Sequence, residues 1–244
     1  MEGLVFLVGV IGNIISVFMF LSPGTTFVRI VKNKSTQEFE SFPYICTLLS
    51  SSLWTYYGLT KPGSFLVATV NGFGVAVEII YVSLFLFFAP PSKRTGIMIG
   101  IMNVGFLGAA LSMTYLLLNG EVRIDAIGLM CAGLNIIMYA SPLSAMKRVV
   151  TTKSVEYMPF LLSFFFFLNG GVWTFYAVLV RDFFLGVPNA IGFVLGTVQL
   201  VLYAIYINPN KASKHLAADL VEERWQKQPL LIPSNSTHSV EDII

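Results

Sequence analysis

The 244-residue sequence contains little charge, little cysteine and little histidine. Lysine, arginine, aspartate and glutamate together make up 11 % of it, whereas a soluble domain carries about 25 %. The 15 basic and 13 acidic residues almost balance, and a nucleic-acid partner would require a clustered basic face. We therefore predict a protein that does not bind nucleic acid and whose main solvent is lipid.

The cysteines and histidines are not placed to form a metal site or a catalytic site. Cys46 and Cys131 fall in apolar stretches, where we interpret them as small packing residues and not as a disulfide. His215 and His238 lie near the C-terminus, outside every apolar stretch. The sequence also has no phosphate-binding glycine loop and no zinc-ligand spacing. We predict that the protein is not an enzyme and that it holds no metal and no other cofactor.

Apolar residues dominate the chain, with 55 % hydrophobic residues and a mean hydropathy of +0.75. Seven stretches have the length that spans a bilayer as a helix, and Glu78 is the only charged residue inside them. We predict an all-α integral membrane protein with seven transmembrane helices. The stretches are Leu4–Leu21, Phe42–Leu59, Phe65–Phe88, Ile97–Leu118, Ala126–Met146, Phe160–Val180 and Phe183–Ile207.

Lysine and arginine are shared unequally between the two predicted sides of the membrane. One side has only Lys61, Arg123 and Arg181, and the other twelve basic residues lie in the remaining loops and the tail. Because basic loops stay in the cytosol, we predict a multi-pass protein with a lumenal or extracellular N-terminus and a cytosolic C-terminus. Residues 208–244 turn polar and are predicted to form a cytosolic tail that is largely disordered.

The sequence is nearly duplicated: residues 13–89 resemble residues 132–207 in hydropathy and in motifs. Ser22-Pro23 recurs as Ser141-Pro142, and Trp54-Thr55-Tyr56-Tyr57 as Trp173-Thr174-Phe175-Tyr176, each 119 residues later. Many membrane transporters are built from such repeats, with the substrate site at the repeat interface.

The number of helices fits a 3+1+3 arrangement. A three-helix unit enters the membrane on one face and leaves on the other, so two units joined directly would be inverted. The stretch Ile97–Leu118 has no counterpart in the other half, and as a linker helix it restores a parallel arrangement. The predicted parts are a first three-helix bundle (residues 1–92), a linker helix (93–123), a second bundle (124–207) and the tail (208–244).

Two tryptophans and two asparagines occupy equivalent positions in the two repeats: Trp54 and Trp173, and Asn71 and Asn189. A buried amide needs hydrogen-bond partners, and contact between helices is its ordinary role in membranes. Two indoles that face each other can instead stack on the C–H faces of a sugar ring, while two amides bind its hydroxyls. We interpret the four residues as the binding site for a polar, uncharged, ring-shaped ligand.

Four prolines also repeat. Pro23 and Pro142 lie near the cytosolic ends of the first and fifth predicted helices, where the loss of a backbone hydrogen bond favours a hinge. Pro43 and Pro159, 116 residues apart, lie at the starts of the second and sixth. There a hinge and simple helix punctuation fit equally well.

These motifs closely resemble those of plant SWEET sugar transporters over about residues 4–207. SWEETs are a known example of parallel repeats, and within them the chain looks most similar to the vacuolar-membrane subgroup. The resemblance implies a sugar as the small-molecule substrate and a homo-oligomer in the bilayer. The matching stretches are Leu21-Ser22-Pro23, Lys34-Ser35-Thr36, Pro43-Tyr44, Leu53-Trp54-Thr55-Tyr56-Tyr57-Gly58, Val70-Asn71-Gly72-Phe73-Gly74, Tyr139-Ala140-Ser141-Pro142-Leu143 and Val187-Pro188-Asn189.

The resemblance also implies roles for individual residues. In SWEETs the matching tryptophans and asparagines line the sugar pocket, and a proline tetrad lets the helices bend and close the cytosolic gate. Positions that match Met19, Ser50, Met138 and Asn169 border the pocket, and small residues there resemble the sucrose carriers. Two methionines and an asparagine narrow the space here, which predicts a preference for glucose or fructose. A sucrose-transporting SWEET is the alternative.

At the opposite, non-cytosolic side, the resemblance makes Tyr57, Tyr176 and Asp182 an outer gate, closed by hydrogen bonds between tyrosine and aspartate. Glu78 could couple transport to protons, but no span contains a histidine, a lysine or a second carboxylate to relay them. We therefore interpret Glu78 as a neutral hydrogen-bonding group between helices. Without an ion to drive it, the predicted carrier is a uniporter.

Three other classes of protein share parts of this pattern. A seven-helix receptor has the same helix count and orientation but no three-helix duplication. A proton-coupled amino-acid carrier of the proline-glutamine loop type has the same plan, but a glutamine follows its hinge proline, where this chain has Gly24 and Leu143. A purely structural membrane protein would leave the paired asparagines unexplained.

Overall fold

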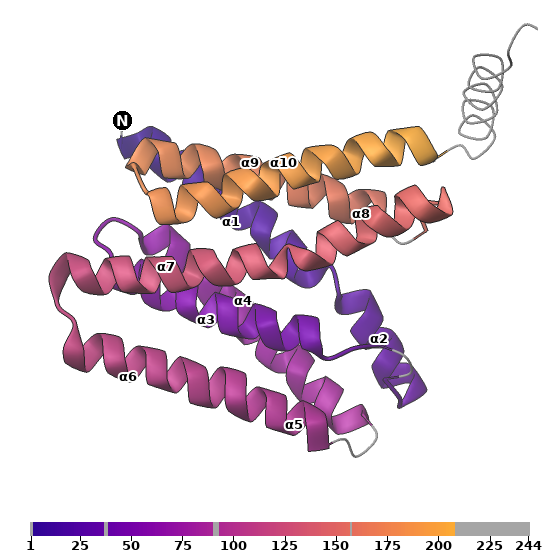
Figure 1. Ribbon diagram of the computed structural model, residues 1–244, viewed down its shortest axis with the longest axis horizontal. Coiled ribbons are helices and arrows are strands. Elements are labelled where there is room, and N and C mark those ends of the chain that lie inside the picture. The colour runs from indigo at the N-terminus through magenta and orange to yellow at the C-terminus, as the bar shows by residue number, and fades with distance from the viewer. Residues whose placement is uncertain (1, 37–38, 90–92, 157, 208–244) are drawn as a thin grey trace, which may run out of the picture.

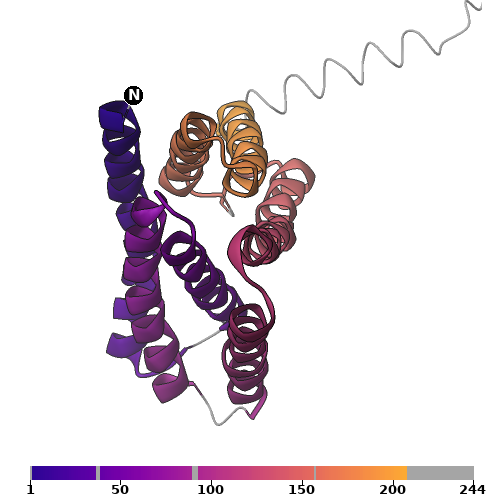
Figure 2. The same ribbon diagram turned by 90° about the vertical axis from the view of Figure 1, so that its left-hand side faces the viewer.

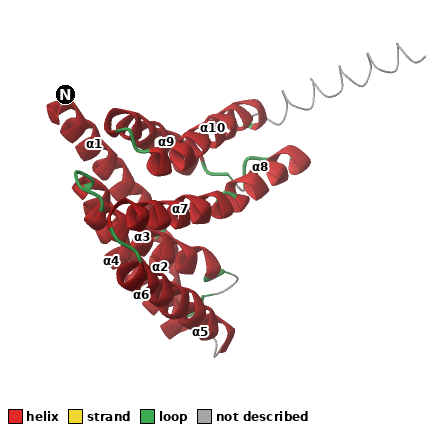
Figure 3. Cartoon of the chain, turned by 60° about the vertical axis from the view of Figure 1, so that its left-hand side comes forward, coloured by secondary structure: helices red, strands yellow, loops and turns green. Residues whose placement is uncertain are grey.

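The computed structural model describes residues 2–36, 39–89, 93–156 and 158–207, and all of its regular elements are helices (Figures 1 and 3). The predicted all-α class is confirmed, and the predicted tail over residues 208–244 lies outside the described residues. The helices are α1 (Glu2–Leu21), α2 (Gly24–Asn33), α3 (Phe42–Thr60), α4 (Phe65–Phe88), α5 (Lys93–Ile99), the π-helix η1 (Gly100–Phe106), α6 (Leu107–Leu117), α7 (Gly120–Met138), α8 (Ala140–Thr152), α9 (Phe160–Val180) and α10 (Phe183–Tyr206).

Among the described residues, six helical segments are long and apolar enough to cross a membrane. They are Glu2–Asn33, Phe65–Phe88, Thr95–Leu117, Gly120–Thr152, Phe160–Val180 and Phe183–Tyr206. The remaining predicted span is α3, whose hydropathy is lowered by Thr47 and Ser50–Ser52. It packs against α4, α7 and the linker segment α5–η1–α6, and ten of its 19 residues are buried. Since protein and not lipid surrounds much of α3, it does not need the same apolar composition.

Three helix boundaries differ clearly from the prediction: the first span continues to Asn33, not Leu21, and the fifth runs from Gly120 to Thr152. The fifth span begins at Gly120, not at Ala126, because Glu121, Arg123 and Asp125 belong to the helix. The Arg123 Nε donates to the carbonyl oxygens of Thr114 at 3.1 Å and Leu118 at 2.9 Å. Arg123 thus satisfies carbonyl groups that the end of α6 leaves unpaired, a role that a search for charge-free stretches does not detect.

The six long helices outside the linker form two equivalent bundles. In the first bundle α4 packs against both α1 and α3, and in the second α10 packs against both α7 and α9. The bundles meet where α1 contacts α9 and where α3 contacts α7, and the linker packs on α3 and α7 (Figure 2). The third helix of each repeat therefore lies between the first and the second.

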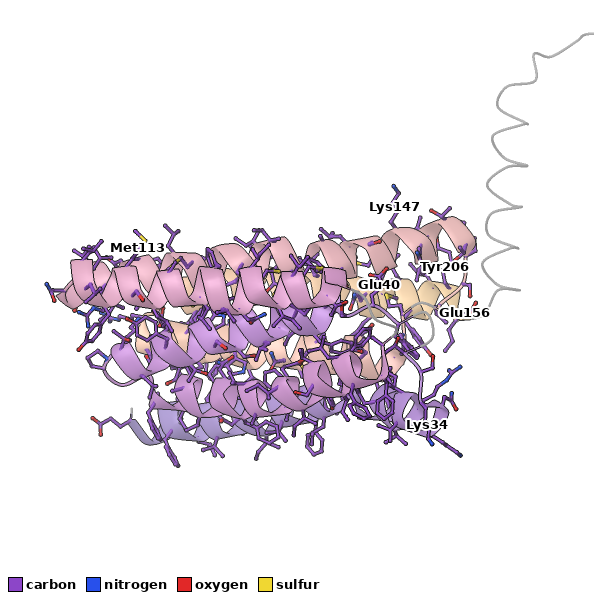
Figure 4. The ribbon with its side chains drawn as sticks, turned by 90° about the horizontal axis from the view of Figure 1, so that it is seen from below. Lys34, Glu40, Met113, Lys147, Glu156 and Tyr206 are labelled. Carbon is purple, nitrogen blue, oxygen red and sulfur yellow. The ribbon has the colours of Figure 1, made fainter. Side chains whose placement is uncertain are left out.

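The predicted hinge positions coincide with helix breaks. The first span breaks between Leu21 and Gly24, at Pro23, and the fifth breaks at Tyr139, close to Pro142. Pro43 lies in the first turn of α3, and Pro159 is the N-cap of α9. We call the end of the molecule with these four residues the proline end and the opposite end the Asp182 end. Figure 4 shows labelled charged residues gathered at the proline end: Lys34, Glu40, Lys147 and Glu156.

Small residues set the distance between α3 and α4. A Cβ atom added to Gly58 would lie 2.5 Å from the backbone nitrogen of Ala68, so the two helices touch through their backbones. The equivalent pair in the second repeat is Ala177 on α9 and Gly186 on α10, with the glycine and the alanine exchanged. There a Cβ on Gly186 would lie 3.4 Å from the Ala177 Cβ, which is ordinary contact.

We expect Gly58→Ala to destabilise the detergent-purified protein by about 1–3 kcal/mol, because overpacking separates α3 from α4. Gly72→Ala is the matched control, since its Cβ would meet nothing within 4 Å and alanine favours a helix. Thermal unfolding should give a lower melting temperature for Gly58→Ala only. Equal melting temperatures for the two variants would contradict the backbone contact.

Candidate substrate-binding cavity

A cavity of about 510 Å³ lies between the two bundles, within the size range of small-molecule sites. Side chains from α1, α3 and α4 line it on one side, and side chains from α7, α9 and α10 on the other. All eight residues predicted to bind or border the substrate line this one cavity. They are Met19, Ser50, Trp54, Asn71, Met138, Asn169, Trp173 and Asn189.

Each tryptophan is held by a side chain of the opposite bundle. The Trp173 Nε1 donates to the Ser16 Oγ at 3.0 Å, and the Trp54 Nε1 donates to the Asn135 Oδ1 at 3.4 Å. Both indoles are buried. Gly12 leaves room for one of them, since a Cβ there would lie 3.0 Å from the Trp173 Cε2.

The two repeated asparagines satisfy part of their hydrogen-bonding capacity within their own helices. The Asn71 Nδ2 donates to the Val67 carbonyl oxygen at 2.9 Å, and the Asn189 Nδ2 donates to the Leu185 carbonyl oxygen at 2.8 Å. In each case the acceptor lies one helical turn earlier. Within the described residues the amide oxygens of both side chains have no hydrogen-bond partner, so they can accept from a ligand in the cavity.

Ser16 and Asn135 also line the cavity, although the sequence analysis did not identify them. The Ser16 Oγ donates to the Asn169 Oδ1 at 2.6 Å, and the Ser50 Oγ donates to the Asn135 Oδ1 at 3.0 Å. A signal was present in the sequence: the two residues are 119 positions apart, and each lies three residues before a predicted pocket methionine.

The predicted prolines take different positions relative to the cavity. Pro23, Pro43 and Pro142 line it, whereas Pro159 is not among the described residues that do. Their function as a gate remains a prediction.

Tyr57, Lys61 and Asp182 form a bonded cluster at the Asp182 end. The Tyr57 hydroxyl lies 2.9 Å from both carboxylate oxygens of Asp182, and the Lys61 Nζ lies 2.7 Å from the Asp182 Oδ2. The Lys61 Nζ also donates to the Tyr57 hydroxyl at 3.0 Å, and the Asp182 Oδ1 accepts from the Leu185 backbone nitrogen at 3.1 Å. The carboxylate thus has a charged partner, a neutral partner and a capping role at the start of α10.

The structure brings together only part of the predicted outer gate. Tyr176 is buried, and its ring lies edge-on to Trp173 with a centroid distance of 5.3 Å. It makes no hydrogen bond to Asp182 within the described residues. Lys61 was missed because we considered it only as a loop charge, although it follows Tyr57 by four residues, one helical turn.

The interpretation of Glu78 as a hydrogen-bonding group between helices is wrong. Its side chain is buried and lines the cavity, on the same face of α4 as Asn71. Within the described ranges its Oε2 has no hydrogen-bond partner. Glu78 is also the only acidic or basic residue among those that line the cavity.

Comparison with known proteins agrees with this duplicated geometry. The sequence model of a family described as "Sugar efflux transporter for intercellular exchange" matches the chain twice, at residues 6–93 and 125–211. The chain belongs to this family, the SWEETs. The predicted resemblance is therefore confirmed: this SWEET is a sugar transporter and not an enzyme, and the receptor and amino-acid-carrier alternatives lose their basis.

Individual relatives support the assignment. The chain is 61 % identical to the bidirectional sugar transporter SWEET17 of Arabidopsis thaliana over 83 % of this chain and 86 % of that protein. It is 57 % identical to SWEET16 of the same plant over 85 % of this chain and 92 % of that protein. A solved structure of a eukaryotic SWEET transporter is similar with a TM-score of 0.79 and 40 % identity, covering 84 % of this chain and 97 % of that one.

We expect Lys61→Met to open the Asp182 end more often, because it leaves the buried Asp182 carboxylate without its charged partner. Cys131 is fully buried. When Cys46 is replaced by alanine, Cys131 is the only cysteine left in the sequence, and its reaction with a methanethiosulfonate reagent reports opening. The reaction should accelerate roughly tenfold, as the loss of a charged hydrogen bond implies. Arg181→Gln removes a positive charge from the same end as a control, and equal acceleration by both variants would contradict a specific role for Lys61.

Proposed function

We propose that this SWEET is a bidirectional facilitative uniporter that moves monosaccharides, glucose or fructose, by alternating access. The observation that carries the proposal is the cavity between the bundles, which two indoles and four amides line. Indole faces suit the C–H faces of a sugar ring, and amides suit its hydroxyls because they both donate and accept hydrogen bonds. Apart from Glu78, this lining carries no charge, as befits a neutral substrate.

The geometry of the two ends supports alternating access. The Asp182 end is closed by the bonds among Tyr57, Lys61 and Asp182, while the cavity extends toward the prolines at the other end. In the proposed cycle, bending at Pro23 and Pro142 closes the proline end as the Asp182 end opens. A carrier that releases sugar on both sides needs only weak binding, and a millimolar dissociation constant corresponds to about −4 kcal/mol.

The absence of a proton relay along the cavity favours uniport. Neither histidine nor lysine nor a second carboxylate accompanies Glu78 among the cavity-lining residues that the structure describes. Lys61 and Asp182 already neutralise each other.

The resemblance to the vacuolar SWEET subgroup favours the vacuolar membrane over the plasma membrane. The basic loops favour a cytosolic proline end, with the N-terminus in the lumen. We also propose a homo-oligomer in which each chain has its own pathway.

Uptake into vesicles that contain only the purified protein tests the proposed function. We expect glucose and fructose to enter and leave, and an imposed pH gradient to leave the initial rate unchanged. Asn71→Ala and Asn189→Ala should each lower hexose flux about tenfold, because each removes a buried amide contact. Asn119→Ala, at an exposed position outside the cavity, is the control. Hexose flux that survives both cavity substitutions would place the substrate elsewhere.

Selectivity gives a second test. Met19→Val combined with Asn169→Ser should raise the rate of sucrose uptake itself, and with it the ratio of sucrose to glucose uptake, because both changes enlarge the cavity. Met113→Val, at an exposed position on α6 (labelled in Figure 4), controls for loss of a methionine. An unchanged sucrose-to-glucose ratio in the double variant would argue that other residues set the substrate size.

A further inference from the structure

We propose that the tryptophans are positioned by two copies of one side-chain clasp, in which serine and asparagine have exchanged places between the repeats. The Trp54 clasp consists of Trp54, Ser50 and Asn135. The Trp173 clasp consists of Trp173, Asn169 and Ser16. Ser16 and Asn135 are positioning residues, and each acts as a pair with its partner. The inference rests on the proposed function, because its consequences are measured as sugar transport.

The positions establish the equivalence of the clasps. Ser16 corresponds to Asn135, Ser50 to Asn169 and Trp54 to Trp173, each at an offset of 119 residues. Each clasp therefore contains one hydroxyl and one amide. In the Trp54 clasp the serine lies on the same helix as the tryptophan, whereas in the Trp173 clasp the asparagine does.

The chemistry of the donors fixes how each clasp is oriented. An indole N–H can only donate, so the Ser16 Oγ accepts from Trp173 and must direct its own proton to the Asn169 Oδ1. In the other clasp the Asn135 Oδ1 accepts from both Trp54 and Ser50. Both clasp asparagines are thus held by their oxygens.

This orientation divides the cavity into donors and acceptors. The Nδ2 groups of Asn135 and Asn169 make no hydrogen bond within the described residues, and both side chains line the cavity. Asn71 and Asn189 have the reverse arrangement, since their Nδ2 groups bond to their own helix. Among the described residues that line the cavity, the Nδ2 groups of Asn135 and Asn169 and the Oδ1 atoms of Asn71 and Asn189 are therefore the amide atoms without a protein partner, and a sugar hydroxyl can bind one of each.

Each clasp also lies at one of the two contacts between the bundles. The Trp173 clasp joins α1 to α9, and the Trp54 clasp joins α7 to α3, the helix pairs through which the bundles meet. The indole of one bundle is therefore oriented by a side chain of the other. A movement of one bundle against the other changes both indoles together.

An exchange experiment tests the pairing. Ser16→Asn alone and Asn169→Ser alone should each raise the apparent KM for glucose about tenfold, because each breaks a buried hydrogen-bonded pair. The double variant reproduces the arrangement of the Trp54 clasp and should return to within about twofold of wild type. Residues that act independently would instead give roughly the hundredfold product. The mirrored exchange, Ser50→Asn with Asn135→Ser, should behave in the same way.

Two further variants keep the result interpretable. Thr69→Ala removes the 3.0 Å hydrogen bond from Thr69 to Asn13, which joins α1 and α4 outside the cavity, and it should leave the glucose KM unchanged. If Ser16→Asn does not fold, Ser16→Ala should raise KM while Ser16→Thr, which retains a hydroxyl, should not. Unchanged KM in the single variants, or a double variant equal to their product, overturns the clasp. Wild-type vesicles that carry no sugar would instead overturn the proposed function.

Discussion

The hydrogen bonds between the two bundles are the interaction on which the rest of the structure depends. At the centre of a membrane protein, a polar side chain has little water to bind and must find a partner inside the fold. Ser16, Ser50, Asn135 and Asn169 meet this requirement across the bundle interface, and the tryptophans complete it. The same bonds hold the bundles together, shape the cavity and turn amide groups toward its interior. In the proposed function, structural cohesion and substrate recognition therefore share one set of atoms.

At two contacts the repeats have kept a pair of residue types while exchanging the positions that supply them. Gly58 faces Ala68 in the first repeat, and Ala177 faces Gly186 in the second. The serine and asparagine of the clasps are exchanged in a similar manner. In both cases the packing requirement applies to the combined volume of two facing side chains, since a close-packed interior tolerates changes that keep the total volume. Two halves of one chain can therefore diverge at each position while they keep the same contact.

Hydropathy and the internal offset were sufficient to predict the helical class, the 3+1+3 plan and the repeated tryptophans and asparagines, which the structure gathers in one cavity. The other predicted pocket residues came from the resemblance to SWEETs, and they line the same cavity. Hydropathy and the offset fail where a residue acts through a partner distant in sequence. From the sequence, Lys61 was interpreted as a loop charge, but in the structure it forms an ion pair with Asp182. Arg123 was likewise taken to lie outside the fifth helix, although its side chain binds a carbonyl oxygen after the end of α6. Glu78 was predicted to form a hydrogen bond between helices, but its Oε2 has no partner among the described residues. Spacing along the chain predicts which face of a helix a residue occupies, but not which side chain from another helix meets that face.

The polarity of α3 has a consequence for how the protein is made. A segment enters the bilayer from the translocation channel according to its own apolarity. Among the described residues, α3 is the one long helix that is not apolar enough to cross a membrane on composition alone. Its neighbours α4, α7 and the linker are all synthesised after it. The contacts that bury α3 are therefore complete only once α7, a helix of the second repeat, has been translated.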